Sequence, residues 1–196
     1  MKKSIIIPTI ILLSAITFQT HAQSNEIAVR SEIKETKTEE KGLRKEKRKE
    51  RTALRKLEGK EVGLASKYSF TNDFGNIKPV QWKRTIYFDE AVFMQNKQLV
   101  TAFYDSNSKL VGTTMKSSFD KLPLIARKEI KEKYKDYKVE DVIFYDDNEE
   151  NETDMIIYGI QFDDADNYFV ELSKGDKKEV VKVDTSGEVY HFTTIK

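Results

Sequence analysis

Two similar nine-residue stretches, KVDTSGEVY at 182–190 and FYDSNSKLV at 103–111, decide the fold class. In each, a strand-like run leads into an aspartate, a few small polar residues follow, and a second strand-like run begins. This pattern is typical of a β-hairpin with a type I turn followed by a bulge. The two stretches lie 79 positions apart (103 to 182). Similar hairpins at one offset predict a structural unit that occurs twice.

The expected turn sets the cross-strand neighbours in both hairpins. It predicts the pairs Val183–Val189, Val181–His191, Lys182–Tyr190, Val180–Phe192, Tyr104–Leu110 and Phe103–Val111. Because side chains alternate between the two faces of a sheet, one face is the expected core: Ala91, Phe93, Tyr104, Leu110, Val170, Leu172, Val181, Val183 and Val189. The other face still carries apolar side chains: Phe103, Val111, Val180, Tyr190 and Phe192.

A helix is expected before each set of strands. Phe70 and Phe74 share one face of a helix over 68–74, and Asp120 and Pro123 are typical of a helix start. The second helix has an apolar stripe at Leu122, Ala126, Ile130 and Tyr134. The alternating runs predict strands at 80–85, 87–95, 99–104, 109–114, 139–145, 155–162, 168–173, 179–184 and 188–195, with turns at 96–97, Gly175 and Gly187.

The first 22 residues have the layout of a secretory signal peptide. Lys2 and Lys3 precede an apolar run of 14 residues, 5–18, and Ala22 closes a small-residue cleavage site. A membrane-spanning helix needs about 20 apolar residues, and Pro8 interrupts this run. The pattern predicts export to the periplasm or the medium, with no stable membrane insertion after cleavage. A lipoprotein is excluded because the chain has no cysteine.

Composition excludes several kinds of site. The 196 residues include 34 Lys+Arg, 33 Asp+Glu, two His and no Cys. Without cysteine there is no disulfide, no thiol nucleophile and no Cys-ligated metal. After cleavage His191 is the one histidine left, on a predicted strand, which is too few for a His-based zinc site and offers no evident triad. No glycine-rich phosphate loop occurs. The sequence therefore predicts no enzyme, no catalytic residue, no metal and no cofactor.

Two charged segments stand out. Residues 41–60 have ten basic and three acidic residues, and favour a solvated helix over 43–58 that docks through Leu54 and Leu57. Nucleic-acid binding is not expected there, because export separates the chain from genomic DNA and aromatics for base stacking are absent. Residues 146–166 have nine carboxylates and no Lys or Arg. Such a segment is either a solvated loop or a calcium ligand set, although its spacing does not match an EF-hand.

The second half of the chain resembles the PepSY-like family of exported proteins, also described as β-lactamase-inhibitor-like. The matching positions are Leu122-Pro123, Ala126, Ile130, Lys133-Tyr134, Val139, Tyr168, Val170, Leu172, Val181, Val183-Asp184, Gly187 and Val189. The first half looks like a diverged copy at Phe70, Phe74, Val80, Trp82 and Tyr104-Asp105, but it lacks the Leu-Pro helix start. The resemblance implies an α+β fold, export and a binding or inhibitory role, with no catalytic residues.

The expected organisation is α+β, with two tandem helix-plus-antiparallel-sheet units. A signal peptide (1–22) and a charged helical segment (23–62) precede a first unit (63–115) and a second unit (116–196) that carries the acidic insertion 146–166.

The expected function is recognition of a protein or peptide partner through an open sheet face, in an inhibitor-like manner. The candidate contact residues are Trp82, Phe103, Val111, Val180, Tyr190 and Phe192, with core packing as the other interpretation of Trp82. The alternative is a calcium-binding or structural envelope protein that uses the acidic insertion.

Overall fold

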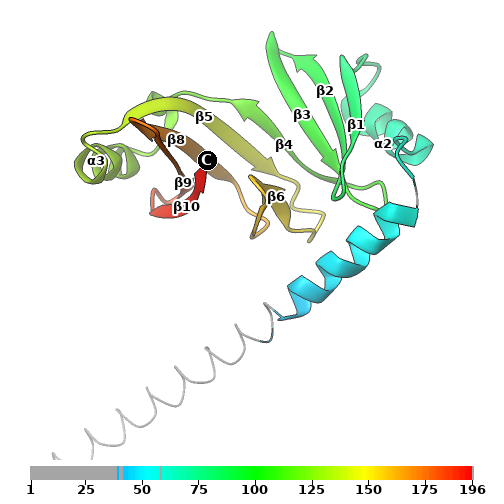
Figure 1. The fold of residues 1–196 in the computed structure, drawn as a ribbon. Coiled ribbons are helices and arrows are strands. Elements are labelled where there is room, and N and C mark those ends of the chain that lie inside the picture. The colour runs from blue at the N-terminus through cyan, green and yellow to red at the C-terminus, as the bar shows by residue number, and fades with distance from the viewer. Residues whose placement is uncertain (1–38, 40–41, 58, 196) are drawn as a thin grey trace, which may run out of the picture. The chain divides into compact units, whose positions relative to one another are not determined.

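The computed structural model describes residues 39, 42–57 and 59–195 (Figure 1). The expected signal peptide, 1–22, lies outside the described residues. The chain divides into two compact units, Met1–Glu50 and Arg51–Lys196. Residues 42–57 are helical, and the architecture described below is that of the second unit.

Besides the helical residues 51–57, the described part of this unit contains three helical segments and ten strands. The helical segments are α2 (Leu64–Phe74), the 3-10 helix η1 (Phe119–Lys121) and α3 (Leu124–Lys133). The strands are β1 (Gln81–Arg84), β2 (Asp89–Gln95), β3 (Gln98–Tyr104), β4 (Leu110–Lys116), β5 (Lys138–Asp147), β6 (Met155–Ile157), β7 (Ile160–Phe162), β8 (Asn167–Lys174), β9 (Lys177–Asp184) and β10 (Val189–Ile195).

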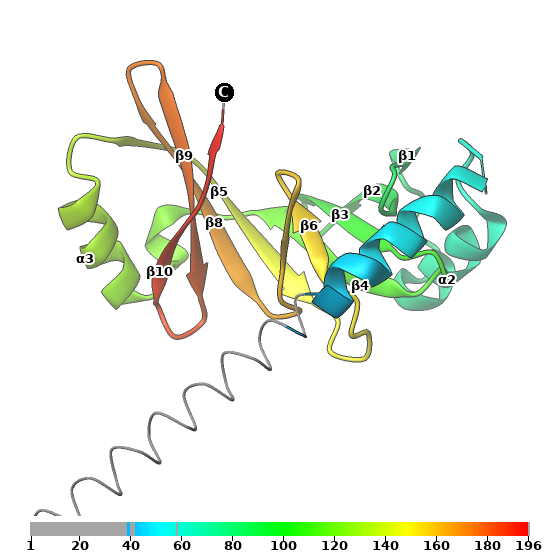
Figure 2. The same ribbon diagram turned by 60° about the horizontal axis from the view of Figure 1, so that its bottom comes forward.

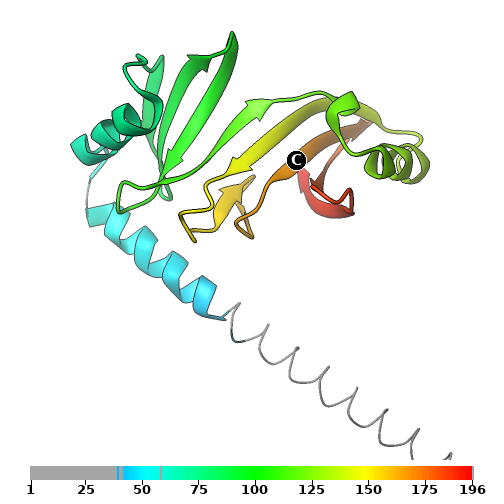
Figure 3. The ribbon, with the colours of Figure 1, turned by 180° about the vertical axis from the view of Figure 1, so that it is seen from behind.

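Eight of the strands form one antiparallel sheet in the order β1-β2-β3-β4-β5-β8-β9-β10. Strands β6 and β7 form a separate two-stranded hairpin. In chain order α2 precedes β1 to β4, and α3 precedes β5, β8, β9 and β10. Figures 1 and 3 show α2 and α3 at opposite ends of the sheet.

Both helices cover the same face of the sheet, the helix face. Its register is traced by a row of residues that pair one after another from β3 to β9, namely Val100, Met115, Phe144, Tyr168 and Val183. Residues directly opposite each other on neighbouring strands share a face. Val100 packs in one core with Phe70 of α2, and Val183 packs in another with Ile130 of α3. The predicted core is therefore confirmed, with Leu110 and Val189 partly buried at its margins.

A third core lies on the opposite face, the insertion face. Its buried members are Phe88, Val111, Tyr145, Met155, Phe162, Phe169 and Val180. Met155 and Phe162 belong to β6 and β7, so the hairpin within 146–166 packs onto the sheet. Figure 2 shows β6 near the middle of the sheet, between α2 and α3.

The two aspartate turns have the predicted geometry. The backbone N–H of Asp105 donates to Lys109 O (3.0 Å), and that of Asp184 donates to Glu188 O (3.3 Å). Each turn ends at a residue with positive φ, Ser108 or Gly187. The predicted pairs Tyr104–Leu110, Val183–Val189, Lys182–Tyr190 and Val181–His191 are confirmed.

Two predicted pairs are wrong because a bulge shifts the register beyond each turn. Phe103 lies opposite Gly112 rather than Val111, and Val180 lies opposite Thr193 rather than Phe192. One extra residue on one strand moves every later partner by one position.

Two element predictions are also wrong. The run 155–162 is a hairpin rather than one strand, because Tyr158 and Gly159 both adopt positive φ and reverse the chain. Asp120 lies in η1 and does not cap α3, whose N-cap is Pro123 without a side-chain cap hydrogen bond.

Residues 51–57 are held by Arg55, not by Leu54 and Leu57 as expected from the sequence. Leu54 and Leu57 are exposed, whereas Arg55 is buried. Its guanidinium lies 3.2 Å from Asp89 Oδ1 and donates to the carbonyl oxygens of Tyr104 and Asp105 at 3.0 and 2.7 Å. A helix with few apolar residues is thus fixed by one buried cation rather than by an apolar stripe.

Asp89 is the carboxylate that Arg55 contacts, and it is fully buried. Arg84 donates to both of its carboxylate oxygens, at 2.7 and 2.9 Å, and the Ser66 hydroxyl donates to Oδ2 at 2.7 Å. Burial alone raises the pKa of Asp89, but the hydrogen bonds from Arg84 and Ser66 and the charges of Arg55 and Arg84 outweigh burial and lower the pKa.

We expect Asp89→Asn to lower the free energy of unfolding by about 3–5 kcal/mol, because it leaves two arginines beside a neutral amide. Asp136→Asn is the matched control, since its ion pair with Lys174 is exposed and should contribute less than about 1 kcal/mol. Urea unfolding of both variants at neutral pH measures the difference.

The loss in the free energy of unfolding caused by Asp89→Asn should depend on pH. Because the folded-state pKa of Asp89 lies below its ordinary value, its stabilisation is present above that ordinary value and is lost as the pH falls through the folded-state pKa. Unfolding midpoints of wild type and variant should therefore converge in acid. A gap that stays constant down to strongly acidic pH would contradict the assignment.

Candidate functional site

The acidic insertion carries the β6–β7 hairpin, which packs onto the sheet, so it is not a solvated loop throughout as considered from the sequence. Its exposed carboxylates lie on a segment whose apolar residues, Met155 and Phe162, are buried against the insertion face. The ring centre of Phe162 lies 5.0 Å from that of Phe169 and 5.2 Å from that of Tyr145. Most of the insertion face of the second half is therefore covered by the chain itself.

Asp105 ties the insertion to the first hairpin. Its Oδ1 accepts the backbone N–H groups of Asn107 and Lys109 at 2.8 and 3.0 Å. Its Oδ2 accepts from Asn151 Nδ2 at 3.3 Å and Thr153 Oγ1 at 3.4 Å. The same residue therefore closes the turn and orients the start of the insertion. Asp184 closes the equivalent turn without such contacts, accepting from Gly187 and Glu188 N–H at 2.9 Å.

The junction between β4 and β5 depends on Gly112. A Cβ at this position would lie 2.6 Å from Asp146 O and 2.7 Å from the Tyr145 ring and hydroxyl. The absent side chain lets Tyr145 cross β4, where its hydroxyl donates to Val111 O (3.1 Å) or Asp147 Oδ1 (2.8 Å). Burial, followed by the hydrogen bond to Asp147, raises the pKa of Tyr145, so the hydroxyl stays protonated as a donor.

The residues predicted to contact a partner occupy different environments. Val111 and Val180 are fully buried in the core of the insertion face, so they offer no surface to a partner. Phe103 and Phe192 pack at the edge of that core and are half-buried. Tyr190 is exposed, with the Lys182 ammonium 5.4 Å from its ring centre. The expectation of one continuous apolar face fails at Val111 and Val180, because β6 and β7 pack over that part of the sheet.

Trp82 lies on the other face, in the core beneath α2. Its ring is 5.5 Å from Phe70 and 6.2 Å from Tyr104, and it is only partly exposed. These contacts match the core-packing interpretation of this residue.

An apolar surface that the sequence analysis missed occurs on β2 and β3. We call it the β2–β3 strip: Val92, Met94, Leu99 and Thr101. Met94 and Leu99 are cross-strand partners, 49% and 52% exposed, and Val92 pairs with Thr101. Their neighbours Phe93 and Val100 are buried on the helix face, so alternation places the strip on the insertion face. The turn at 96–97 and the alternation beside it were the available signals.

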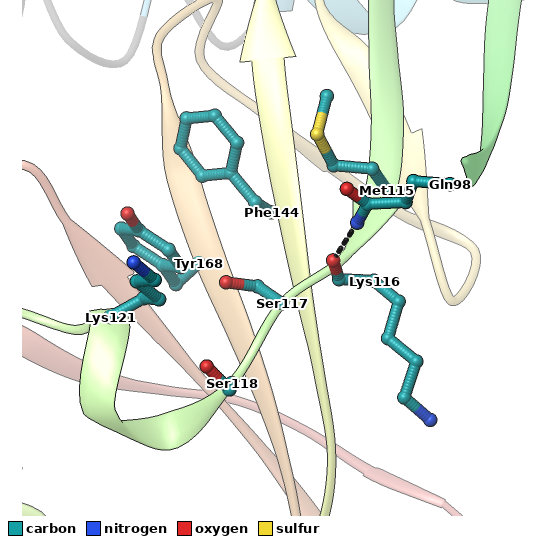
Figure 4. Close-up of a pocket in the computed structure, with 8 residues that line it drawn as sticks. All are labelled: Gln98, Met115, Lys116, Ser117, Ser118, Lys121, Phe144 and Tyr168. Carbon is teal, nitrogen blue, oxygen red and sulfur yellow. Dashed lines mark hydrogen bonds between the residues drawn. The ribbon is translucent and has the colours of Figure 1, made fainter. Parts of the chain in front are cut away.

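A small pocket lies on the helix face between the two covered ends. Phe144 and Tyr168 form its wall with ring centres 4.7 Å apart, and Met115 lies beside them (Figure 4). Lys121 and the Lys116 backbone lie along its edge, where the Gln98 side chain donates to Lys116 O. The cavity of about 330 Å³ is lined by Gln98, Met115, Lys116, Ser117, Ser118, Lys121, Phe144 and Tyr168. It can hold one side chain or a small apolar group.

Within 39, 42–57 and 59–195, no three His, Asp or Glu side chains gather as metal ligands. Burial raises the pKa of Asp147; the Tyr145 hydrogen bond opposes this shift, whereas the charges of Asp164 and Asp166 add to it. His191 is exposed on β10, 3.5 Å from Thr194 Oγ1. Among these same residues, no helix is long and apolar enough to cross a membrane.

Comparison with known proteins identifies the fold. No protein-family model and no curated protein sequence matches the chain. A DUF2874 family protein from Bacteroides uniformis is similar in structure, with 12% identity and a TM-score of 0.56 over 68% of this chain and 90% of its own. A BLIP-like protein from Bacteroides fragilis has 17% identity and a TM-score of 0.52 over 69% of this chain and 87% of its own.

A third similar structure is a Bacteroides eggerthii protein whose name proposes a periplasmic location. It has 12% identity and a TM-score of 0.55 over 69% of this chain and 90% of its own. At these identities the likeness concerns the fold alone. The chain has a mixed helix and antiparallel-sheet fold of the BLIP-like kind.

We expect Gly112→Ala to lower the free energy of unfolding by about 1–3 kcal/mol, because the added methyl group must displace Tyr145 or the β5 backbone. Gly42→Ala is the control, since a Cβ there meets nothing within 4 Å. Chemical denaturation compares the two. Equal stability of both variants would mean that Tyr145 can leave β4 at no cost.

Proposed function

We propose that this chain is an exported, non-enzymatic binding protein that recognises a protein or peptide partner on its insertion face. The observation that carries this function is the β2–β3 strip, where Met94 and Leu99 are half exposed side by side on a sheet surface. Exposed apolar patches on folded proteins commonly mark contact sites. Phe103 borders the strip because it shares β3 and the same face.

The similar structures support a binding role. One of them is named BLIP-like and another by a periplasmic location. For this chain we infer an inhibitor-like mode, in which a rigid sheet presents its face to a partner. Because the strip is held on paired strands, little conformational entropy is lost on binding. The signal-peptide pattern of residues 1–22 supports export and fits a periplasmic or secreted protein.

We further propose that the fold consists of two tandem PepSY-like units, with the boundary near residue 116. In support, each half is a helix followed by four sheet strands, and each contains the same aspartate turn with its N–H donors. The insertion 146–166 then distinguishes the second unit. Because the insertion covers the insertion face of the second PepSY-like unit, recognition is directed to the first PepSY-like unit, 63–115. Tyr190 and Phe192 then lie apart from the contact surface, on β10.

We expect the double substitution Met94→Asp/Leu99→Asp to abolish capture of the partner from an envelope extract, because central apolar contacts typically contribute 2 kcal/mol or more, roughly thirtyfold in affinity. Wild-type and variant chains are immobilised, and retained proteins are identified by mass spectrometry. Leu124→Asp/Ile125→Asp on α3 is the matched control, with equal charge change at exposed apolar positions.

The control should retain every protein that wild type retains, and all three chains should unfold at similar denaturant concentrations. Equal recovery by both double variants, or no specific protein on wild type, would contradict recognition through the β2–β3 strip.

A further inference from the structure

A second surface lies at the end of β2 that is far from the β2–β3 strip. Residues 55, 56, 59 and 60, together with residues 83–86 from β1 and the turn after it, enclose a pocket of about 550 Å³. It is lined by Arg55, Lys56, Gly59, Lys60, Lys83, Arg84, Thr85 and Ile86. Met94 and Leu99 lie at the other end of β2, beside the 96–97 turn. The two surfaces can therefore be occupied at the same time.

Five of the eight residues that line this pocket are cationic, and none of them is acidic. Arg55 and Arg84 belong to the buried Asp89 cluster and form its base. Lys56 and Lys60 are exposed, and Lys83 lies 3.9 Å from Glu90 with most of its side chain in solvent. Among the described residues, Glu61, Asp89 and Glu90 are the acidic residues nearest in sequence; Asp89 is buried against Arg55 and Arg84, and the three lysines are exposed.

Large apolar side chains flank the lysines instead of being buried. Ile86 is 53% exposed and Leu57 is 86% exposed. On α2, Leu64 and Tyr68 are each 71% exposed, one helical turn apart. Figures 1 and 3 show α2 beside β1, and a Cβ on Gly63 would lie 3.2 Å from the Arg84 guanidinium. The start of α2 therefore borders the cationic pocket.

The turn that presents Ile86 is closed by hydrogen bonds of Thr85. The Thr85 hydroxyl donates to Phe88 O and accepts the Phe88 backbone N–H, both at 3.0 Å. Phe88 is buried in the core of the insertion face. Ile86 is thus held outward by a closed turn with a buried end, so its exposure is built into the fold.

We propose that this end of the molecule is a peripheral contact for an anionic lipid surface. Lys56, Lys60 and Lys83 hold headgroup phosphates over the pocket, while Ile86 and Leu57 enter the boundary between headgroups and acyl chains. A soluble phosphate would use the cations alone and leave the apolar side chains in water, whereas a lipid satisfies both. Basic side chains interleaved with exposed Leu, Ile and Tyr are typical of interfacial membrane contacts.

The contact is reversible and does not span the bilayer. Lysine stems can lie along an apolar surface while their ammonium groups stay at headgroup level. With three lysines and two large apolar side chains, the described residues provide both attractions that peripheral binding requires. Docking at this end leaves the β2–β3 strip free for a partner, so the inference goes beyond the proposed binding function and does not depend on it.

The test is flotation of the full chain with phosphatidylcholine vesicles, with and without phosphatidylglycerol. Lys56→Gln/Lys60→Gln/Lys83→Gln should weaken partition into the anionic vesicles about a hundredfold, roughly fivefold for each lysine. Lys128→Gln/Lys135→Gln/Lys177→Gln is the control with the same charge change at exposed positions elsewhere, and should leave partition nearly unchanged. Unfolding midpoints verify that all variants are folded.

A second pair of variants tests the apolar contribution. Ile86→Ser should weaken partition roughly tenfold by removing one large apolar side chain from the interface, whereas Leu124→Ser, with similar exposure on α3, should not. The proposal is overturned if both triple variants lose binding equally. It is also overturned if inorganic phosphate displaces the chain from vesicles while Ile86→Ser binds normally, since the site would then take a soluble anion.

Discussion

Strand β4 pairs with β5 from Gly112–Asp147 to Lys116–Ile143, and this pairing makes one sheet from two sets of four strands. It is possible because Gly112 has no side chain where the Tyr145 ring crosses. The Tyr145 hydroxyl in turn donates a hydrogen bond to Val111 O of β4. The Tyr145 ring belongs to the same core as Met155 and Phe162. The close approach of β4 and β5 gives the two sets of strands a shared face on which the insertion packs.

The insertion changes what the sheet can do. An antiparallel sheet with helices on one face usually leaves its other face to solvent or to a partner. Here β6 and β7 cover part of that face with their own apolar residues, and Asn151 and Thr153 secure the start of the insertion at Asp105. The open apolar surface is consequently displaced to β2 and β3. The acidic insertion thus covers the insertion face over one set of four strands and leaves the β2–β3 strip exposed on the other.

Buried charge has a comparable role at the β1–β4 end of the sheet. The cluster of Asp89, Arg55 and Arg84 fixes residues 51–57 and the β1–β2 turn against the same end of the sheet. This attachment needs few apolar contacts, so Leu57 and Ile86 remain outside the core. The same ion pairs that stabilise this end therefore also shape its cationic and apolar surface.

The alternation of apolar residues and the chemistry of the two aspartate turns were sufficient to predict most strands, the core residues under both helices and four cross-strand pairs. These features are local, because turn geometry and side-chain alternation depend on residues a few positions apart. The strand boundaries at 155–162 failed because a Tyr-Gly reversal is a weak signal, and two pairs failed because a bulge is invisible in an alternating pattern.

The tertiary structure alone decided which apolar residues are available. Val111 and Phe103 look alike in sequence, yet one is buried beneath the insertion hairpin and the other lies at its edge. Arg55 is one basic residue among ten between 41 and 60, and only its approach to Asp89 distinguishes it. Sequence by itself determined most of the strands and the helix before each set of four; the joining of both sets into one sheet through β4 and β5, the burial and the ion pairing came from contacts between distant segments, which no local pattern contains.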